Sequence, residues 1–309
     1  MFMKCLVLYL FLNLLLCGNI YAKTYQVDDV VEAEFIINKS FQIKLPSGKW
    51  IVAERSTEYY YGLTSKVYSL IRLENNKAIE AIEIAEIKTA GVYENAVNQA
   101  IYMALFKNKY DGCYARPEYT AVKFYVKGST HNCFWLGHSD IYNDLFTPDD
   151  PELMTANTQI KRWIKKNNVE LPKVALFSNH SYFSRLKAGK WYVLSYMIDP
   201  KILGAPKNMY ITEDTSEYHR NNIENYPEHK KIMKKWISTS AQRHIDFENS
   251  INVLKRHRLD LNDLLPVKND QKNELSLNIA EQLKSLSDLF KSGVLTKKEF
   301  DSAKKKLLN

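Results

Sequence analysis

Glycine and cysteine are both scarce in this chain, and each shortage argues against a class of site. Only 10 of the 309 residues are glycine, and no glycine-rich run resembles the loops that hold nucleotide phosphates. The four cysteines include no Cys-x-x-Cys pair, and no His-x-x-x-His pair occurs, so the common zinc-ligand spacings are missing. We therefore expect neither a cofactor nor a bound metal.

Catalytic motifs and concentrated charge are missing as well. Neither a Gly-x-Ser-x-Gly elbow nor a zincin helix occurs in the sequence. The formal charge of +8 is mildly basic, and it lacks the concentrated basic surface of a nucleic-acid binder. We expect no nucleic-acid partner, and we favour a non-catalytic role.

Long apolar runs are absent except at the very start of the chain. Lys4 precedes an almost unbroken apolar run from Cys5 to Cys17, and a more polar stretch then ends at the small residue Ala22. This order is typical of a secretory signal peptide, and the run is too short for the roughly 20 residues that span a bilayer. The prediction is a signal peptide over residues 1–22 of an exported, periplasmic or secreted protein. An uncleaved N-terminal anchor and a lipoprotein signal at Cys17 are the alternatives.

Two cysteines remain once the signal peptide is removed. Cys113 and Cys133 would then meet an oxidising compartment, where a pair of cysteines is typically a disulfide. The prediction is a Cys113–Cys133 bond. Two separately buried thiols and a metal pair are the alternatives.

Residues 23–265 are predicted to form an α+β body in which an antiparallel sheet packs against helices. Strand patterns come first and helical patterns later, without the alternation of a doubly wound fold. Residues 41–45 alternate apolar and polar side chains, residues 46–48 favour a turn, and residues 50–53 start a return strand. Further strands are expected over residues 67–73, 120–126, 133–136, 174–183 and 191–197, and helices over residues 93–104, 150–164 and 227–258.

The segment 78–87 is ambiguous between strand and helix. Its acids, Glu80, Glu83 and Glu86, recur at every third residue. This spacing fits neither the two-residue period of a strand nor a full helical turn. Its β-branched isoleucines favour a strand. We predict a strand that pairs with residues 67–73.

After a predicted linker at residues 266–278, residues 279–309 carry the most specific local signals in the chain. Gly293 suits the end of a first helix, because glycine adopts the left-handed conformation without penalty. Thr296 and Glu299 form a Thr-x-x-Glu capping box at the start of a second helix. A two-helix hairpin is predicted, and it needs a partner because two short helices bury too little surface to be stable alone. The residues expected to serve in oligomerisation or docking are Leu283, Leu286, Leu289, Phe290, Gly293, Leu295, Thr296, Glu299, Phe300, Leu307 and Leu308.

These same residues resemble the SHOCT (short C-terminal) domain in order and spacing. The resemblance rests on the Leu-x-x-Leu-x-x-Leu repeat from Leu283, the turn at residues 293–296 and the Glu299-Phe300 pair. It implies a small helical appendage of a bacterial protein that mediates oligomerisation or docking, and it implies no catalytic residues. We expect the partner to be a second copy of the chain, with docking on the body as the alternative.

Histidines and one acid supply the candidates for an alternative function as a periplasmic hydrolase. Catalytic Ser, His and Asp groups converge in space and not in sequence. The residues that could assemble such a site are His138, Asp140, His180 and His219.

Basic residues also follow two predicted helices. Residues 161–166 place lysine and arginine side chains around Trp163, and residues 230–235 place lysines around Met233 and before Trp236. Such faces can bind an anionic membrane surface. The simpler interpretation is a solvated face opposite a buried stripe.

Overall fold

The computed structural model describes residues 24–39, 41–60, 63–89, 113, 119–126, 129–146, 158–184, 190–207, 209 and 212–265, together with residues 287, 297, 300 and 304. The predicted signal peptide, the helix predicted over residues 93–104 and the predicted linker lie outside the described residues. The chain divides into two compact units, Met1–Asp260 and Leu261–Asn309.

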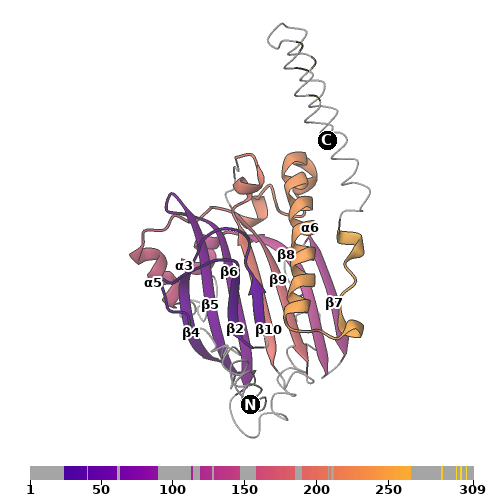
Figure 1. Ribbon diagram of the computed structural model, residues 1–309. Helices are drawn as coiled ribbons and strands as arrows, with labels where there is room; N and C mark the ends of the chain where they lie inside the picture. The colour runs from indigo at the N-terminus through magenta and orange to yellow at the C-terminus, as the bar shows by residue number, and fades with distance from the viewer. Residues whose placement is uncertain are drawn as a thin grey trace, which may run out of the picture. The chain divides into compact units, whose positions relative to one another are not determined.

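An eight-stranded antiparallel sheet dominates the first unit (Figure 1). Its strands lie in the order β1-β4-β5-β6-β10-β9-β8-β7. Strands β4 to β6 pair in chain order, strands β7 to β10 do the same, and the β6–β10 pair joins the two runs. The bounds are β1 Val30–Val31, β4 Trp50–Tyr60, β5 Leu63–Glu74, β6 Lys77–Thr89, β7 Thr120–Val126, β8 Thr130–Ser139, β9 Ala175–Ser184 and β10 Trp191–Ile198.

The strand prediction for residues 78–87 is confirmed. They lie within β6, which pairs with β5 through Val67 opposite Ala85 and Leu70 opposite Ile82. The strands predicted over residues 174–183 and 191–197 are confirmed as β9 and β10, which pair antiparallel. Isoleucine branching was therefore a better guide than the spacing of the acids.

One predicted pairing is wrong. The strand β3 (Phe41–Lys44) pairs with β2 (Glu34–Asn38) in a separate two-stranded sheet, and it does not pair with β4. Phe41 packs edge-on against Tyr192 of β10, with ring centroids 5.0 Å apart. The β2–β3 hairpin therefore covers a face of the large sheet.

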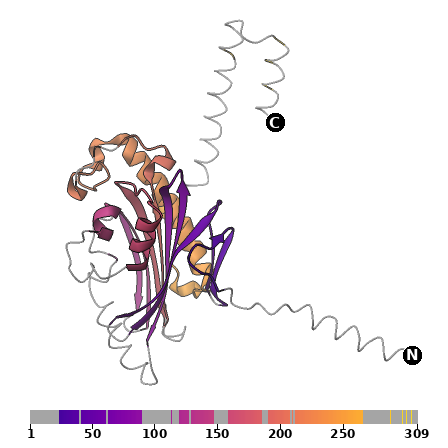
Figure 2. The ribbon, with the colours of Figure 1, turned by 90° about the vertical axis from the view of Figure 1, so that its left-hand side faces the viewer.

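The two faces of the large sheet carry different layers (Figure 2). The helix α6 (Pro227–Ser250) and the β2–β3 hairpin lie on one face. The short helices α3 (Ile141–Phe146) and α5 (Thr158–Lys166) lie on the other, where Ile160, Trp163 and Ile164 pack against Ala53 and Ile71. Because successive residues of a strand point to opposite faces, each strand contributes to both cores.

The helix α6 ends at Ser250, eight residues before the predicted end at residue 258. Asn252 adopts a left-handed conformation with φ of 52°, and the N–H of Val253 reaches back to the carbonyl of Glu248. This is the Schellman arrangement that ends helices, with asparagine in the place that glycine usually takes. Short 3-10 turns follow at Lys255–His257 and Asn262–Leu264.

The predicted fold class, α+β with packed helices and a C-terminal two-helix hairpin, is wrong. The described part of the chain is mostly sheet, with three α-helices of which α6 is the one long element. Strands β4, β5 and β6 run for 11, 12 and 13 residues, longer than their alternating patterns suggest. Every residue of β8 is buried, and a strand covered on both faces shows no alternation that would mark its length.

No C-terminal two-helix hairpin is apparent among the described residues. Of residues 279–309 the structure describes Ser287, Lys297, Phe300 and Lys304, each in a helical conformation. Of the eleven residues predicted for oligomerisation or docking, Phe300 alone lies within this described set. The resemblance to the SHOCT domain and self-association through this segment stay predictions.

The outer strands of the sheet end in irregular structure. The strand β1 pairs with only Trp50 and Ile51 of β4, and the β4–β5 register shifts between Val52 and Glu54. Beyond this bulge, the side-chain oxygen of Gln159 in α5 accepts a hydrogen bond from the backbone N–H of Arg55 at 2.7 Å. On the outer side of β4, a side chain thus takes the hydrogen bond that the backbone N–H of Arg55 could offer to another strand.

Candidate functional site

A cavity of about 390 Å³ lies between the sheet and the helices α3 and α5. Its volume falls in the range of small-molecule sites in proteins. Most of its lining is apolar and comes from both the sheet and the helices. The apolar lining includes Ile71, Ala81, Trp135, Leu145, Ile160, Ile164, Phe177 and Met197.

A row of polar residues crosses the sheet beneath this apolar lining. Glu54 of β4 lies opposite Ser69 of β5, and Ser69 lies opposite Glu83 of β6. Glu83 in turn lies opposite Ser195 of β10, and Ser195 lies opposite Asn179 of β9. Neighbouring strands are about 4.8 Å apart, so the row extends for about 19 Å across five strands.

Both ends of this polar row are hydrogen-bonded internally. The hydroxyls of Ser56 and Ser69 each donate to the carboxylate of Glu54 at 2.9 Å. At the other end, the amide nitrogen of Asn179 donates to the hydroxyl of Ser195 at 2.9 Å. These bonds satisfy polar groups that would otherwise cost free energy on burial.

Glu83, at the centre of the row, has different surroundings. Burial raises its pKa to about 7, and the carboxylates of Glu54 and Glu58 add to the effect. No hydrogen bond to Glu83 exists among the described residues. Its carboxyl group therefore lines a mostly apolar cavity without a hydrogen bond to another described residue, and it changes charge close to neutral pH.

The three-residue spacing of acids along β6 explains why Glu83 stands alone. In a strand, residues 80 and 86 share one face and residue 83 points to the other. On the α6 side, Glu80 forms an ion pair with Arg72 at 2.6 Å, and Glu86 forms one with Lys190 at 2.8 Å. Glu83 faces the opposite way, toward α3 and α5.

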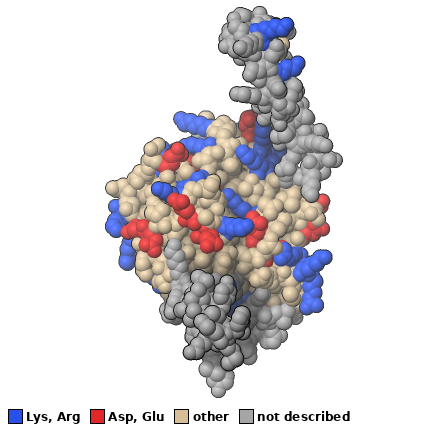
Figure 3. Space-filling model, in the orientation of Figure 1, with Lys and Arg blue, Asp and Glu red and all other residues tan. Residues whose placement is uncertain are grey.

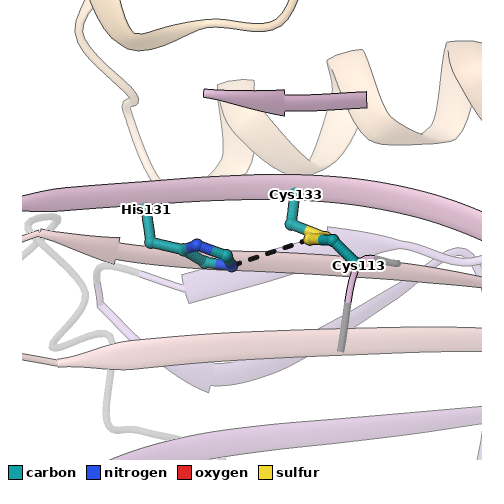
Figure 4. A group of neighbouring side chains, drawn as sticks. All are labelled: Cys113, His131 and Cys133. Carbon is teal, nitrogen blue, oxygen red and sulfur yellow. Dashed lines mark hydrogen bonds between the residues drawn. A yellow bond between two sulfur atoms is a disulfide. The ribbon is translucent and has the colours of Figure 1, made fainter. Parts of the chain in front are cut away.

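The predicted disulfide between Cys113 and Cys133 is confirmed (Figure 4). The Cα atoms lie 6.2 Å apart, within the usual range for a disulfide. His131, two residues before Cys133 on the same face of β8, places its Nε2 atom 4.0 Å from the sulfur of Cys113. Burial and the nearby charge of Lys123 lower the pKa of His131 to about 3, so its imidazole is neutral.

Of the four predicted hydrolase residues, the structure brings two together. The rings of His138 and His219 lie 6.0 Å apart, and both side chains are buried. Asp140 accepts two hydrogen bonds from Asn143 and caps the start of α3. His180 lies four residues along the strands from His138, a separation of about 13 Å.

His180 instead joins a fully buried hydrogen-bonded chain on the α6 face. The Nδ1 atoms of His180 and His244 are 3.1 Å apart, and the Nε2 of His244 lies 3.1 Å from the side-chain oxygen of Asn132. The amide nitrogen of Asn132 donates to Glu248 at 2.7 Å, which fixes the orientation of the amide group. His244 must therefore donate from Nε2 and accept at Nδ1.

The same reasoning fixes the tautomer of His180, at the other end of this series of hydrogen bonds. His180 donates from Nδ1 to His244, so its Nε2 accepts from the hydroxyl of Ser178 at 3.1 Å. Desolvation lowers the pKa of both histidines. Each imidazole is held neutral in one tautomer, which is the arrangement of a structural polar core and leaves no nitrogen of His180 or His244 free to accept a substrate proton.

The tryptophans that accompany the two basic segments are buried. Trp163 is 5% exposed and donates to Asp28 at 2.6 Å, and Trp236 is 0% exposed. Figure 3 shows acidic and basic side chains intermixed over the face it draws. In the described part of the chain, no helix combines the length and the apolar character needed to cross a membrane. Binding to an anionic surface stays a prediction.

The polar row was missed in the sequence, although a signal for it exists. Ser69 and Ser195 interrupt apolar faces of β5 and β10 at alternate positions, where Val67 and Ile71 or Val193 and Met197 are their neighbours on the same side. A small polar residue at such a position marks either a cavity or a buried hydrogen bond. The pattern alone does not say that five strands bring these positions into one row.

Comparison with protein-family models, with curated proteins and with solved structures finds no match for this chain.

Proposed function

We propose that this protein is an exported, non-catalytic binding protein that holds a small amphiphilic molecule in the cavity between the sheet and the helices α3 and α5. The observation that carries the proposal is a carboxyl group, Glu83, that has no hydrogen bond to another described residue and lines a cavity whose walls are mostly apolar. An apolar pocket with a few converging polar groups and one perturbed pKa is the usual form of a small-molecule site.

The cavity indicates the chemistry of the ligand. Its apolar body would lie against side chains such as Ile164, Phe177 and Met197. Its polar end would carry an N–H or O–H donor, since Glu83 offers an acceptor and its neighbours Glu54 and Glu58 disfavour an anionic group. A neutral or protonated amine is the simplest head group that meets both conditions.

Export is supported by the disulfide. The Cys113–Cys133 bond is typical of proteins that reach an oxidising compartment. The predicted signal peptide agrees with this location. A protein in the cell envelope also meets amphiphiles that partition between membranes and water.

The proposal is tested with N-phenyl-1-naphthylamine, a neutral apolar fluorophore that carries one N–H donor. The full chain should bind it saturably with a stoichiometry of one and a blue-shifted emission. Ala81→Phe, which fills the cavity, should abolish this signal. Val126→Phe adds the same ring at a position that is 46% exposed on β7, and it should bind like the wild type.

Two further measurements complete the test. Decylamine should displace the fluorophore, and Glu83→Gln should weaken decylamine at least about tenfold, which corresponds to about 1.4 kcal/mol. Circular dichroism establishes that each variant is folded. Unchanged fluorophore binding by folded Ala81→Phe would refute the cavity as the binding site.

A further inference from the structure

A second group of side chains, on the same face of the sheet but away from Glu83, offers different chemistry. The sulfur atoms of Cys113 and Cys133 and a ring nitrogen of His131 all lie within 4.8 Å of one another (Figure 4). All three residues are buried, with exposures of 0% to 1%. Their arrangement is compact enough for one ion to reach every ligand atom.

We propose that Cys113, His131 and Cys133 form a binding site for a zinc-class divalent cation when the disulfide is reduced. Two thiolates and an imidazole are ligands that zinc and cobalt(II) prefer, with metal–sulfur distances of about 2.3 Å and metal–nitrogen distances of about 2.0 Å. Tetrahedral ligands at those distances lie roughly 3.5–3.8 Å apart. The imidazole already lies close to this separation from the Cys113 sulfur, at 4.0 Å, so the main change is the parting of the two sulfur atoms.

The rigid sheet holds two of the three ligands in place. His131 and Cys133 occupy alternate positions of β8, so both side chains point to the same face. They lie opposite Phe183 and Ser181 of β9 on one side and Tyr125 and Lys123 of β7 on the other. Ligands on paired strands need little reorganisation to bind an ion.

One neighbouring residue favours thiolates once the disulfide opens, against the opposing effect of burial. Lys123 lies directly opposite Cys133 in the β7–β8 pair, and a neighbouring cation favours the thiolate over the thiol. No fourth His, Cys, Asp or Glu joins the group among the residues that the structure describes. The fourth tetrahedral position would then belong to water, as in zinc sites with three protein ligands.

The disulfide and the metal would be alternative occupants of one position. A phosphine reductant transfers two electrons to the disulfide, and with one water molecule the products are two thiols and a phosphine oxide. The divalent cation then displaces both thiol protons to the buffer. A chain that has not been oxidised could in this way retain a cross-link between Cys113 and β8.

Cobalt(II) is the probe that tests the site, because thiolate ligands give it charge-transfer absorption and tetrahedral geometry gives it intense visible bands. The full chain is reduced with tris(2-carboxyethyl)phosphine, freed of reductant without air, and titrated with cobalt(II). We expect one cobalt per reduced chain with both sets of bands, their loss when zinc is added, and no bands from the oxidised protein. The metal should also raise the Tm of the reduced chain.

His131→Ala separates this site from two thiols that bind metal on their own. It keeps both cysteines and should weaken cobalt binding at least tenfold and remove the rise in Tm. His229→Ala, which removes a buried histidine of α6, should behave like the wild type. The proposal is overturned if the reduced wild type shows no cobalt–thiolate absorption, or if His131→Ala binds cobalt as tightly as the wild type.

Discussion

Replacing Glu83 with glutamine should stabilise the folded protein above neutral pH and change its stability little near pH 4. Burial and the carboxylates of Glu54 and Glu58 raise the pKa of Glu83 from 4.5 to about 7. In the unfolded chain this group loses its proton near the ordinary value. As the pH rises through this window, the unfolded state gives up the proton first, so the folded protein loses stability between about pH 4.5 and pH 7.

The size of the effect follows from the same shift. One pKa unit corresponds to about 1.4 kcal/mol, so the ionised carboxylate costs the fold up to about 3 kcal/mol above pH 7. Glu83 is only partly buried and lines a cavity, so water screens part of this cost. We expect Glu83→Gln to gain about 1–3 kcal/mol at pH 8 and close to nothing at pH 4.

Urea unfolding of the wild type and the variant at pH 4, 5, 6, 7 and 8 measures this difference. Comparing the two proteins at each pH cancels, to first order, the pH dependence of stability that they share. Glu170→Gln is the control, since the Glu170 side chain is 65% exposed and its carboxylate forms an ion pair with Lys77 at the surface. It should change stability by less than about 0.5 kcal/mol at every pH.

A gain from Glu83→Gln that is equal at pH 4 and pH 8 would refute the reasoning. It would mean that the variant acts through packing or hydrogen bonding and that the carboxyl group titrates normally. A loss of stability at pH 8 would show that the ionised carboxylate is stabilised in the fold, contrary to its position among acids.

Three further predictions concern the buried polar chain and the disulfide. His244→Phe leaves the N–H of His180 and the oxygen of Asn132 without partners. It should lower the free energy of unfolding in urea by about 2–5 kcal/mol, and a loss below about 0.5 kcal/mol would contradict the buried hydrogen bonds of His244. Because the pKa values of His180 and His244 are lowered, the unfolded state takes up protons first as the pH falls below about 6.5. The Tm of Glu83→Gln, in which the opposing titration of Glu83 is removed, should therefore fall from pH 7 to pH 5, and a flat Tm of this variant would count against neutral burial. Cys133→Ser opens a cross-link between residues 20 positions apart and should cost about 3 kcal/mol of unfolding free energy, with an unchanged urea midpoint as the contrary result.

Local patterns predicted the elements of this fold better than their assembly. The β-branched isoleucines of β6 and the alternation of β3 were sufficient to identify strands, because those signals act within a few residues. The partner of β3 was not predictable in the same way. A tight turn at residues 46–48 favours a hairpin with β4, but the burial of Phe41 against Tyr192 is a contact across 150 residues of sequence.

The candidate site shows the same limit. The sequence singled out His138, Asp140, His180 and His219 by their chemistry, and it drew on Glu83 only as one of three acids whose spacing made a strand hard to tell from a helix. Strand register decides which of these residues face a cavity, and register was not available from one sequence. His180 is inaccessible because α6 covers it, whereas Glu83 lines the cavity under α3 and α5.

The outer strands of the sheet also bear on how copies of this protein behave when they are concentrated. An exposed strand with free backbone groups is a template on which another chain can add and start aggregation. The side chain of Gln159 already occupies the N–H of Arg55, and the bulge between Val52 and Glu54 turns β4 away from a flat ladder. An incoming strand would have to displace the glutamine and match an irregular register at once, so this side of the sheet resists polymerisation without a long edge strand to protect it.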